Sequence, residues 1–133
     1  MANNQKLTEN EIAKIVIDRA LKVHRRLGPG LLESVYEAAL AFELIQTGLK
    51  VQRQLALPVR YENVSLDIGF RVDLLVNDLV IVELKSLQEM SAIHKKVVLT
   101  YLRVADKRLG LLINFGEALL KEGITRIANG MPE

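Results

Sequence analysis

The sequence contains no cysteine, no tryptophan and only two histidines among its 133 residues. Without cysteine the chain can form no disulfide framework and no zinc–thiolate site, and it has no thiol nucleophile. Two histidines are too few to favour a metal site built from imidazole alone. Any metal ion is therefore expected on carboxylates, which favours Mg²⁺ or Mn²⁺. With only three Phe and three Tyr, a base-stacking platform for single strands is not expected.

Long apolar runs and a strong net charge are missing as well. No stretch reaches the roughly 18 uninterrupted apolar residues of a membrane span, and the polar N-terminus lacks the apolar segment of a signal peptide. We therefore expect no membrane partner and a cytoplasmic location. The net charge is only +2, but Lys95, Lys96 and Arg103 lie in a basic stretch, 85–108. Such a stretch fits either a solvated helix face or a nucleic-acid-binding surface.

Length and patterning predict one α/β domain over residues 1–133. A capping box, Thr8-x-x-Glu11, begins a helix expected over about 9–27. A second helix, over about 31–47, is apolar on nearly every face and is expected to be heavily buried. Further patterns predict strands at 51–61 (in one or two pieces around Pro58), 64–76, 79–85 and 109–115, a helix over about 91–105 and an edge strand at 124–127. The order ααβββαβ predicts a mixed β-sheet flanked by helices on both faces, with a right-handed parallel crossover.

Three charged residues stand where a buried pattern would have apolar ones. Asp73 lies inside an apolar run, and Glu83 and Lys85 share one face at the end of the strand expected at 79–85. Two carboxylates on adjacent strands can hold a divalent ion, and a lysine beside them can orient the attacking water and offset phosphate charge. Taken alone, the D-x9-E-x-K spacing favours a surface hairpin with a salt bridge. The apolar run before it and the helix after it favour the metal site.

The turn between the two strands decides between these interpretations. A two-residue turn at Asn77-Asp78 would place Asp73 opposite Val82, on the other face of the sheet from Glu83. A three-residue loop or a bulge would place Asp73 opposite Glu83. The metal site therefore requires the longer connection.

A second cluster lies in the helix expected at about 31–47. Glu33 and Tyr36 share one face of that helix, and Glu33 falls in the first turn, where the helix dipole favours an anion. On helix grounds alone, we expect Glu33 to serve the dipole and Tyr36 to pack in the core. For His24 we expect a structural role, by packing or hydrogen bonding near the turn at 28–30.

The segment from Gly30 to Tyr36 is a GxxExxY string, preceded by HRRLGP and followed by LPVRY, RVDLLV, IVELKS, TYLR and GLLINF. Together these blocks resemble the GxxExxY protein family of the PD-(D/E)XK nuclease superfamily, over roughly residues 8–129. The resemblance implies a restriction-endonuclease-like core. It also implies site roles: Asp73, Glu83, Glu33 and the carbonyl of Leu84 as metal ligands, Lys85 as the catalytic lysine beside Asp73 and Glu83, and Tyr36, Tyr101 and His94 as supporting residues. For His94, an ordinary polar residue in the first turn of its helix is an equally good interpretation.

Two positions depart from the superfamily pattern. The proline of the PD motif is Val72 here, and the glutamine expected four residues before Tyr101 is Val97. That glutamine would be expected to help position the metal site or the substrate. Its replacement favours weak or absent catalysis.

Three functions are consistent with these observations. The first is a nuclease, a phosphodiesterase that hydrolyses nucleic acid with Mg²⁺ or Mn²⁺, with DNA favoured over RNA and with Lys95, Lys96 and Arg103 as substrate contacts. The second is a catalytically weak or inactive nuclease-fold module that binds nucleic acid or has a regulatory role. The third is a partner-binding domain whose charged cluster is an ion-pair network. The apolar content also favours a homodimer, which a nuclease of this size often needs to reach both strands.

Overall fold

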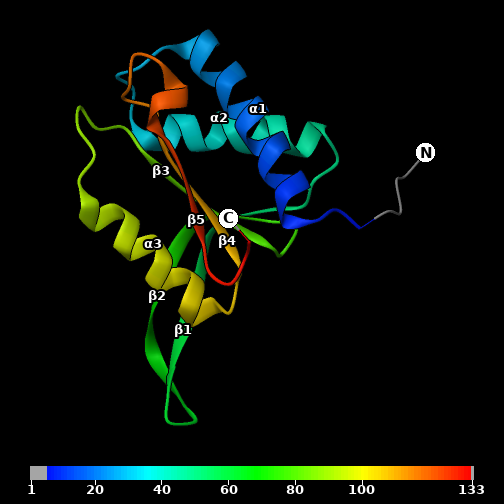
Figure 1. The fold of residues 1–133 in the computed structure, drawn as a ribbon, viewed down its shortest axis with the longest axis vertical. Coiled ribbons are helices and arrows are strands. Elements are labelled where there is room, and N and C mark those ends of the chain that lie inside the picture. The colour runs from blue at the N-terminus through cyan, green and yellow to red at the C-terminus, as the bar shows by residue number, and fades with distance from the viewer. Residues whose placement is uncertain (1–5, 133) are drawn as a thin grey trace.

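The computed structural model describes residues 6–132, and its element order confirms the predicted ααβββαβ followed by an edge strand (Figure 1). The elements are α1 (Glu9–Leu27), α2 (Glu33–Gln46), β1 (Val51–Tyr61), β2 (Val64–Val76), β3 (Val80–Lys85), α3 (Ala92–Ala105), β4 (Leu109–Asn114), the short 3-10 helix η1 (Leu120–Gly123) and β5 (Ile124–Ala128). The predicted capping box begins α1: the Thr8 hydroxyl accepts from the N–H of Glu11, and the Glu11 carboxylate accepts from the N–H of Thr8.

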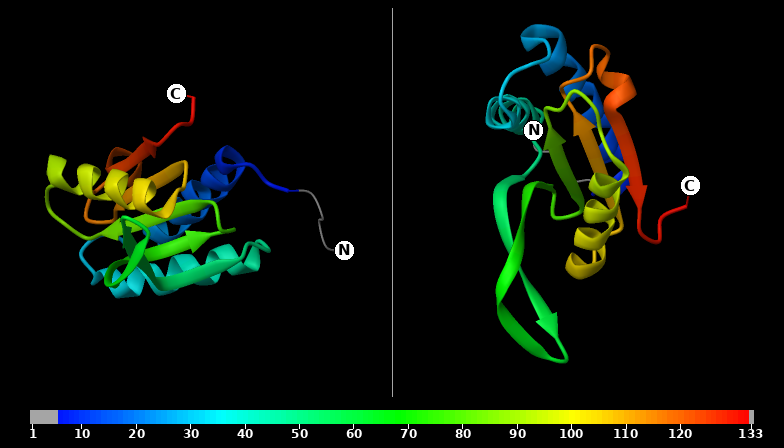
Figure 2. Two further views of the ribbon diagram at one scale, coloured as in Figure 1. Left: turned by 90° about the horizontal axis from the view of Figure 1, so that it is seen from below. Right: turned by 90° about the vertical axis from the view of Figure 1, so that its left-hand side faces the viewer.

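The strands form one mixed sheet in the order β1-β2-β3-β4-β5. Strands β3 and β4 are parallel and are joined through α3, whereas the other neighbouring pairs are antiparallel. Helix α3 covers one face of the sheet and α2 lies on the opposite face (Figure 2), where α1 packs beside it. The arrangement confirms the predicted α/β class.

Strand β3 is buried on both faces, as its apolar run predicts. Val80, Val82 and Leu84 belong to the apolar cluster under α1 and α2, whereas Ile81 belongs to the cluster under α3. Because side chains alternate along a strand, Glu83 follows Ile81 on the α3 side of the sheet.

Helix α2 is shorter and more exposed than predicted. It begins at Glu33, not near residue 31, because the backbone of Leu32 is still extended, with ψ of 149°. Phe42 and Ile45 are 60% and 55% exposed, so the expectation of a heavily buried helix is wrong. Only the stripe around Leu40 packs inward, because α2 covers the sheet from one side and no described element lies over its outer face. Within residues 6–132, no helix combines the length and apolar character required to cross a bilayer.

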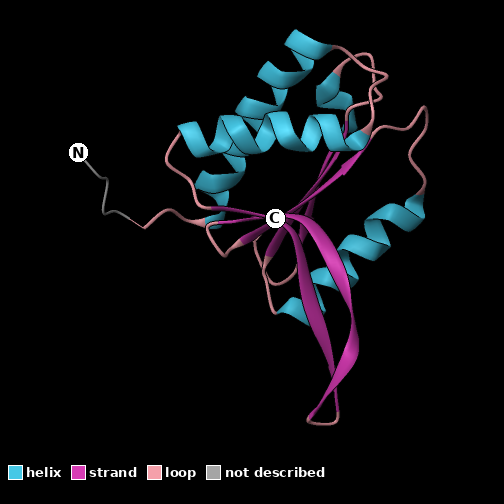
Figure 3. Ribbon diagram, turned by 180° about the vertical axis from the view of Figure 1, so that it is seen from behind, coloured by secondary structure: helices cyan, strands magenta, loops and turns pink. Residues whose placement is uncertain are grey.

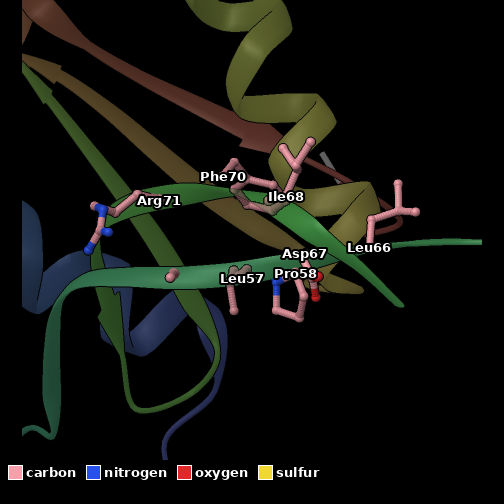
Figure 4. Close-up of a pocket in the computed structure, with 9 residues that line it drawn as sticks. Leu57, Pro58, Leu66, Asp67, Ile68, Phe70 and Arg71 are labelled. Atoms are coloured by element: carbon pink, nitrogen blue, oxygen red, sulfur yellow. The ribbon is translucent and has the colours of Figure 1, made fainter. Parts of the chain in front are cut away.

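The β1–β2 hairpin extends past the helices (Figure 3). Its register is constant from Val51↔Val76 to Pro58↔Gly69 and shifts between Pro58 and Arg60, so the strand is continuous but irregular near its proline. A shallow pocket on the hairpin is lined by residues 56–58 and 66–71, with Ile68 and Phe70 pointing toward α3 (Figure 4). The pocket lies outward from Asp73 along β2 and is separate from the predicted site.

Candidate active site

The loop between β2 and β3 brings Asp73 and Glu83 to the same place in the sheet. Val76 pairs with Val80, so residues 77–79 form a three-residue loop. The first two loop residues, an Asn and an Asp, have φ of 51° and 59°, in the left-handed region that these residue types tolerate best. Continuing this register places Asp73 opposite Glu83, the arrangement that the metal site requires.

Side-chain hydrogen bonds replace the backbone ladder at this pair. The N–H of Asp73 donates to Glu83 Oε1 over 2.8 Å, and the N–H of Leu84 donates to Asp73 Oδ2 over 2.8 Å. Hydrogen bonding between β2 and β3 therefore continues through two carboxylates. Each carboxylate is held by a backbone donor, and their negative charges are concentrated between two strands.

The two carboxylates repel each other in a poorly solvated position. Glu83 is only 8% exposed, and burial raises the pKa of its carboxyl group to about 7, with the charge of Asp73 as the second cause. Weaker effects come from Lys85, which lowers the pKa of Glu83, and from Glu33, which raises it. Burial also raises the pKa of the Tyr101 hydroxyl, with smaller contributions from Glu83 and Asp73. The site therefore has an excess of negative charge, the setting in which a cation binds favourably.

A buried asparagine holds the chain that follows Lys85. Lys85 ends β3 and pairs in register with Asn114 of β4, whose side chain is fully buried. The Asn114 carboxamide accepts from the N–H groups of Leu87 and Gly116, over 2.9 and 3.0 Å, and donates to the Leu87 carbonyl over 3.0 Å. Sequence analysis did not identify this residue. It fixes the start of the connection between Lys85 and α3.

Replacing Asn114 by alanine is expected to lower the free energy of unfolding by about 2–4 kcal/mol, because three partly buried backbone groups lose their partner and a cavity forms at a fully buried side chain. Urea unfolding measures this loss. Asn10 is exposed and accepts one hydrogen bond from Arg126, so Asn10→Ala is the matched control, with an expected change of about 0.5 kcal/mol or less. Equal stability of Asn114→Ala and the wild type would contradict this role.

Tyr36 of the GxxExxY string belongs to the core. It is fully buried and stacks on Phe115 with ring centroids 4.4 Å apart. Its hydroxyl donates to the carbonyl of Gly28 and accepts from the N–H of Leu31 over 3.1 Å, so it fixes the turn before α2. This confirms the expected packing role. His24 is also buried and donates from Nε2 to a backbone carbonyl over 2.8 Å, which confirms its structural role.

Glu33 stands at the exposed first residue of α2, close enough for its charge to act on Glu83. Among residues 6–132, no group of three or more His, Asp or Glu side chains is placed to hold one metal ion. The structure therefore brings together a pair of carboxylates, Asp73 and Glu83, and the part of Glu33 as a ligand stays a prediction. His94 lies in the first turn of α3 and Arg103 lies exposed in its last turn.

Two of the three predicted nucleic-acid contacts lie on the far flank of α3. Lys95 and Lys96 line a pocket between α3 and β5, together with Arg126. On the other flank, Tyr101 stacks on Phe70 of β2 with ring centroids 4.3 Å apart. Strands β2 and β5 lie on opposite sides of β3 and β4. The basic pocket and the carboxylate pair are therefore separated by the helix.

Two polar residues that sequence analysis did not select lie at the site. Gln54 of β1 donates from Nε2 to Asp73 Oδ1 over 3.1 Å and also to Glu37 Oε1. Glu37 of α2 is buried and accepts from Arg53 Nε over 3.1 Å. A charged residue in the apolar pattern of α2 is a signal that could identify Glu37. The polar run around Gln54 carries no such signal.

The arrangement can bind a hard cation and present a second charge to a phosphate. Two fixed carboxylates supply the oxygen ligands that Mg²⁺ prefers, and water and phosphate oxygens can complete its coordination. Lys85 follows Glu83 by two residues on the same strand, so its ammonium group is available on the same side of the sheet.

A family model described as the PD-(D/E)XK nuclease superfamily matches residues 10–127, a range that includes every candidate site residue. No curated protein and no solved structure matches the chain. The match covers most of the sequence, and the fold, with its paired acidic residues at the end of a buried strand, agrees with it. The chain therefore belongs to the PD-(D/E)XK nuclease superfamily.

Proposed function

We propose that the protein is a metal-dependent nuclease that hydrolyses phosphodiester bonds of nucleic acid with Asp73, Glu83 and Lys85. Membership of the superfamily supports a nuclease-like function. The observation that carries the proposal is the register of β2 and β3. It sets Asp73 beside Glu83, with each carboxylate accepting a backbone N–H of the other strand and with Lys85 two residues further along.

The residues present fit a divalent cation such as Mg²⁺ or Mn²⁺, and nucleases of this superfamily generally use divalent metal ions. The donor set consists of carboxylate oxygens. Burial and the charge of Asp73 raise the pKa of Glu83, and a bound cation would favour its ionised form. We propose Asp73 and Glu83 as ligands, with Glu33 and the carbonyl of Leu84 as further ones. A bound ion would lower the pKa of water and offset phosphate charge.

The other site residues either act on the substrate or support the site. The Lys85 ammonium group orients the attacking water and stabilises the negative charge that develops on the phosphate in the transition state. The charges of Glu83 and Asp73 act on the Tyr101 hydroxyl, which can donate a hydrogen bond to a phosphate oxygen. Asp73 is fixed by the N–H of Leu84, so it needs no rearrangement to bind a ligand. His94, in the first turn of α3, has a supporting role, and Tyr36 supports the site by holding the turn before Glu33.

The family within the superfamily, the substrate and the substrate contacts are proposed from the sequence blocks and from the positions of basic residues. We propose membership of the GxxExxY family, DNA as the favoured substrate, and phosphate contacts by Lys95, Lys96 and Arg103. We also propose a cytoplasmic homodimer. The basic pocket on the far flank of α3 supports a substrate path that crosses this helix.

One observation favours a second candidate function, a catalytically weak or inactive module that binds nucleic acid. Val97 occupies the position where the superfamily pattern has a glutamine, and it is 37% exposed on α3. An apolar side chain there can position neither an ion nor a phosphate. Binding without cleavage would then depend on the basic residues and would weaken as salt is added.

Millimolar Mn²⁺ is expected to raise the melting temperature, because an ion that binds only the folded state adds stability, by about 2.7 kcal/mol at a hundred times its Kd. Differential scanning calorimetry with Mn²⁺, with Mg²⁺ and with EDTA measures the shift. The same measurement tests the proposed ligands.

Matched variants identify where the ion binds. Asp73→Asn keeps the size of the side chain but removes its charge, so the shift with Mn²⁺ should be lost. Asp67→Asn, on the exposed part of the hairpin, should keep it. If the wild type does not shift at all, the charged cluster is an ion-pair network and the proposed metal site is wrong.

A further inference from the structure

We propose that Gln54 is a positioning residue for Asp73 and that the buried Glu37 acts through it. This role rests on the proposed function of Asp73, but the contacts that support it are made between side chains of the protein and need no bound metal. The Gln54 amide nitrogen donates to Asp73 Oδ1 over 3.1 Å and to Glu37 Oε1. One amide group therefore connects helix α2 to the strand that carries the proposed metal ligand.

The backbone of Gln54 adopts a conformation that glutamine does not favour. Its φ is 48°, in the left-handed region, although it lies inside strand β1. Such a residue costs on the order of 1–3 kcal/mol and persists only where its surroundings determine it. The register is the same on both sides, Arg53↔Leu74 and Leu55↔Val72, so no inserted residue explains the distortion. The distortion places the Gln54 amide between two carboxylates.

The chain around Gln54 is anchored at several points. The Arg71 guanidinium donates to the carbonyl oxygen of Gln54 over 2.9 Å. The preceding residue, Arg53, donates to Glu37 Oε2 over 3.1 Å, so Glu37 binds two successive residues of β1 with its two oxygens. These contacts hold the strained residue in place.

Gln54 completes the restraint on the Asp73 carboxylate. Asp73 Oδ2 accepts from the N–H of Leu84, and Asp73 Oδ1 accepts from Gln54, so each oxygen has its own donor. Two donors from different strands fix the plane of the carboxylate. The Glu37 carboxylate pairs with Arg53 through Oε2, and its Oε1 accepts from Gln54. It therefore determines that the amino end of the Gln54 amide faces the two acids.

The first test uses the protein without any metal. Gln54→Gly removes the amide but suits a φ of 48°, so the fold should be retained. Because Asp73 loses one restraint, we expect the N–H of Leu84 to exchange with solvent about tenfold faster, the effect of weakening one hydrogen bond to a charged group. The N–H of Ile113 in β4 should exchange at its wild-type rate. Gln52→Gly, two residues earlier in β1, is the matched control, and it should not change the rate at Leu84 relative to Ile113.

The second test measures Mn²⁺ binding by calorimetry. Gln54→Gly should weaken binding about ten- to a hundredfold, as the loss of a hydrogen-bond partner of a metal ligand does. Glu37→Ala should weaken binding in the wild type but should add nothing in the Gln54→Gly background, because Glu37 acts through Gln54. Gln54→Asn, which keeps an amide and tolerates the left-handed backbone, should restore part of the affinity.

The two tests distinguish a failure of the positioning role of Gln54 from a failure of the proposed metal site. Unchanged exchange at Leu84 in Gln54→Gly, relative to Ile113, would overturn the positioning role whether or not metal binds. Faster exchange at Leu84 in a protein whose wild type does not bind Mn²⁺ would support the positioning role and overturn the metal site. Full additivity of Glu37→Ala and Gln54→Gly would overturn the part assigned to Glu37.

Discussion

Replacing Lys85 by alanine is expected to reduce nucleic-acid cleavage by about a hundredfold or more, because one contact that stabilises transition-state charge is lost. The fold should be unaffected, since Lys85 is the half-buried last residue of β3. Asp73→Ala should reduce cleavage at least as much and should also weaken Mn²⁺ binding. Time courses on DNA and RNA substrates with Mg²⁺ or Mn²⁺ measure the rates, and circular dichroism checks the fold.

Lys14→Ala is a suitable control, because it removes an exposed lysine from α1 and should cleave at the wild-type rate. Equal residual cleavage by the wild type and Lys85→Ala would indicate a contaminating nuclease and would contradict the catalytic role. If both are silent on every substrate but the wild type binds nucleic acid with salt-dependent affinity, the binding module is the correct function.

The second large effect concerns the stability of the metal-free protein as pH changes. The pKa of Glu83 is raised from 4.5 to about 7 by burial and by the charge of Asp73. Between these values the folded protein keeps a proton that the unfolded chain releases. The stabilisation from this proton is therefore fully present below pH 4.5 and is lost as pH rises to about 7. A shift of this size corresponds to about 3 kcal/mol.

Glu83→Gln should remove this dependence. The amide keeps an oxygen for the N–H of Asp73 and carries no charge, so the variant should exceed the wild type in stability by about 3 kcal/mol at pH 8 and by little at pH 4.5. Urea unfolding at both pH values, in EDTA, measures the difference. Glu122→Gln, an exposed change in η1, should match the wild type at both. A constant difference between Glu83→Gln and the wild type across this range would contradict the raised pKa.

Strand β3 shows what local sequence determines. Its apolar run, ended by Glu83 and Lys85, predicts a strand covered on both faces with two charged residues at one end, and the structure confirms the strand and its burial. The same local rules predict α1 with its capping box, since the cap is formed by residues three apart. Features that depend on residues a few positions apart can therefore be predicted from the sequence.

The site itself depends on details that the sequence left open. The sequence is compatible with a turn at Asn77-Asp78 of two or three residues, and only the paired strands decide it. The conformation of Gln54 depends on Glu37, Asp73 and Arg71, which are 17 to 19 residues away in the chain. Phe42 is exposed because no element among the described residues covers the outer face of α2. The sequence pattern of α2 alone does not show whether such an element exists.

The base and the outer part of the β1–β2 hairpin can change independently of each other. The carboxylate pair lies at its base, whereas its outer part, 59–68, extends past the helices. Because the loop 77–79 sets the register of β2 and β3, removing or adding equal numbers of residues on both outer strands leaves Asp73 facing Glu83. The tip is therefore the part of this small domain where new surface contacts can evolve, or be grafted, without altering the residues proposed for hydrolysis.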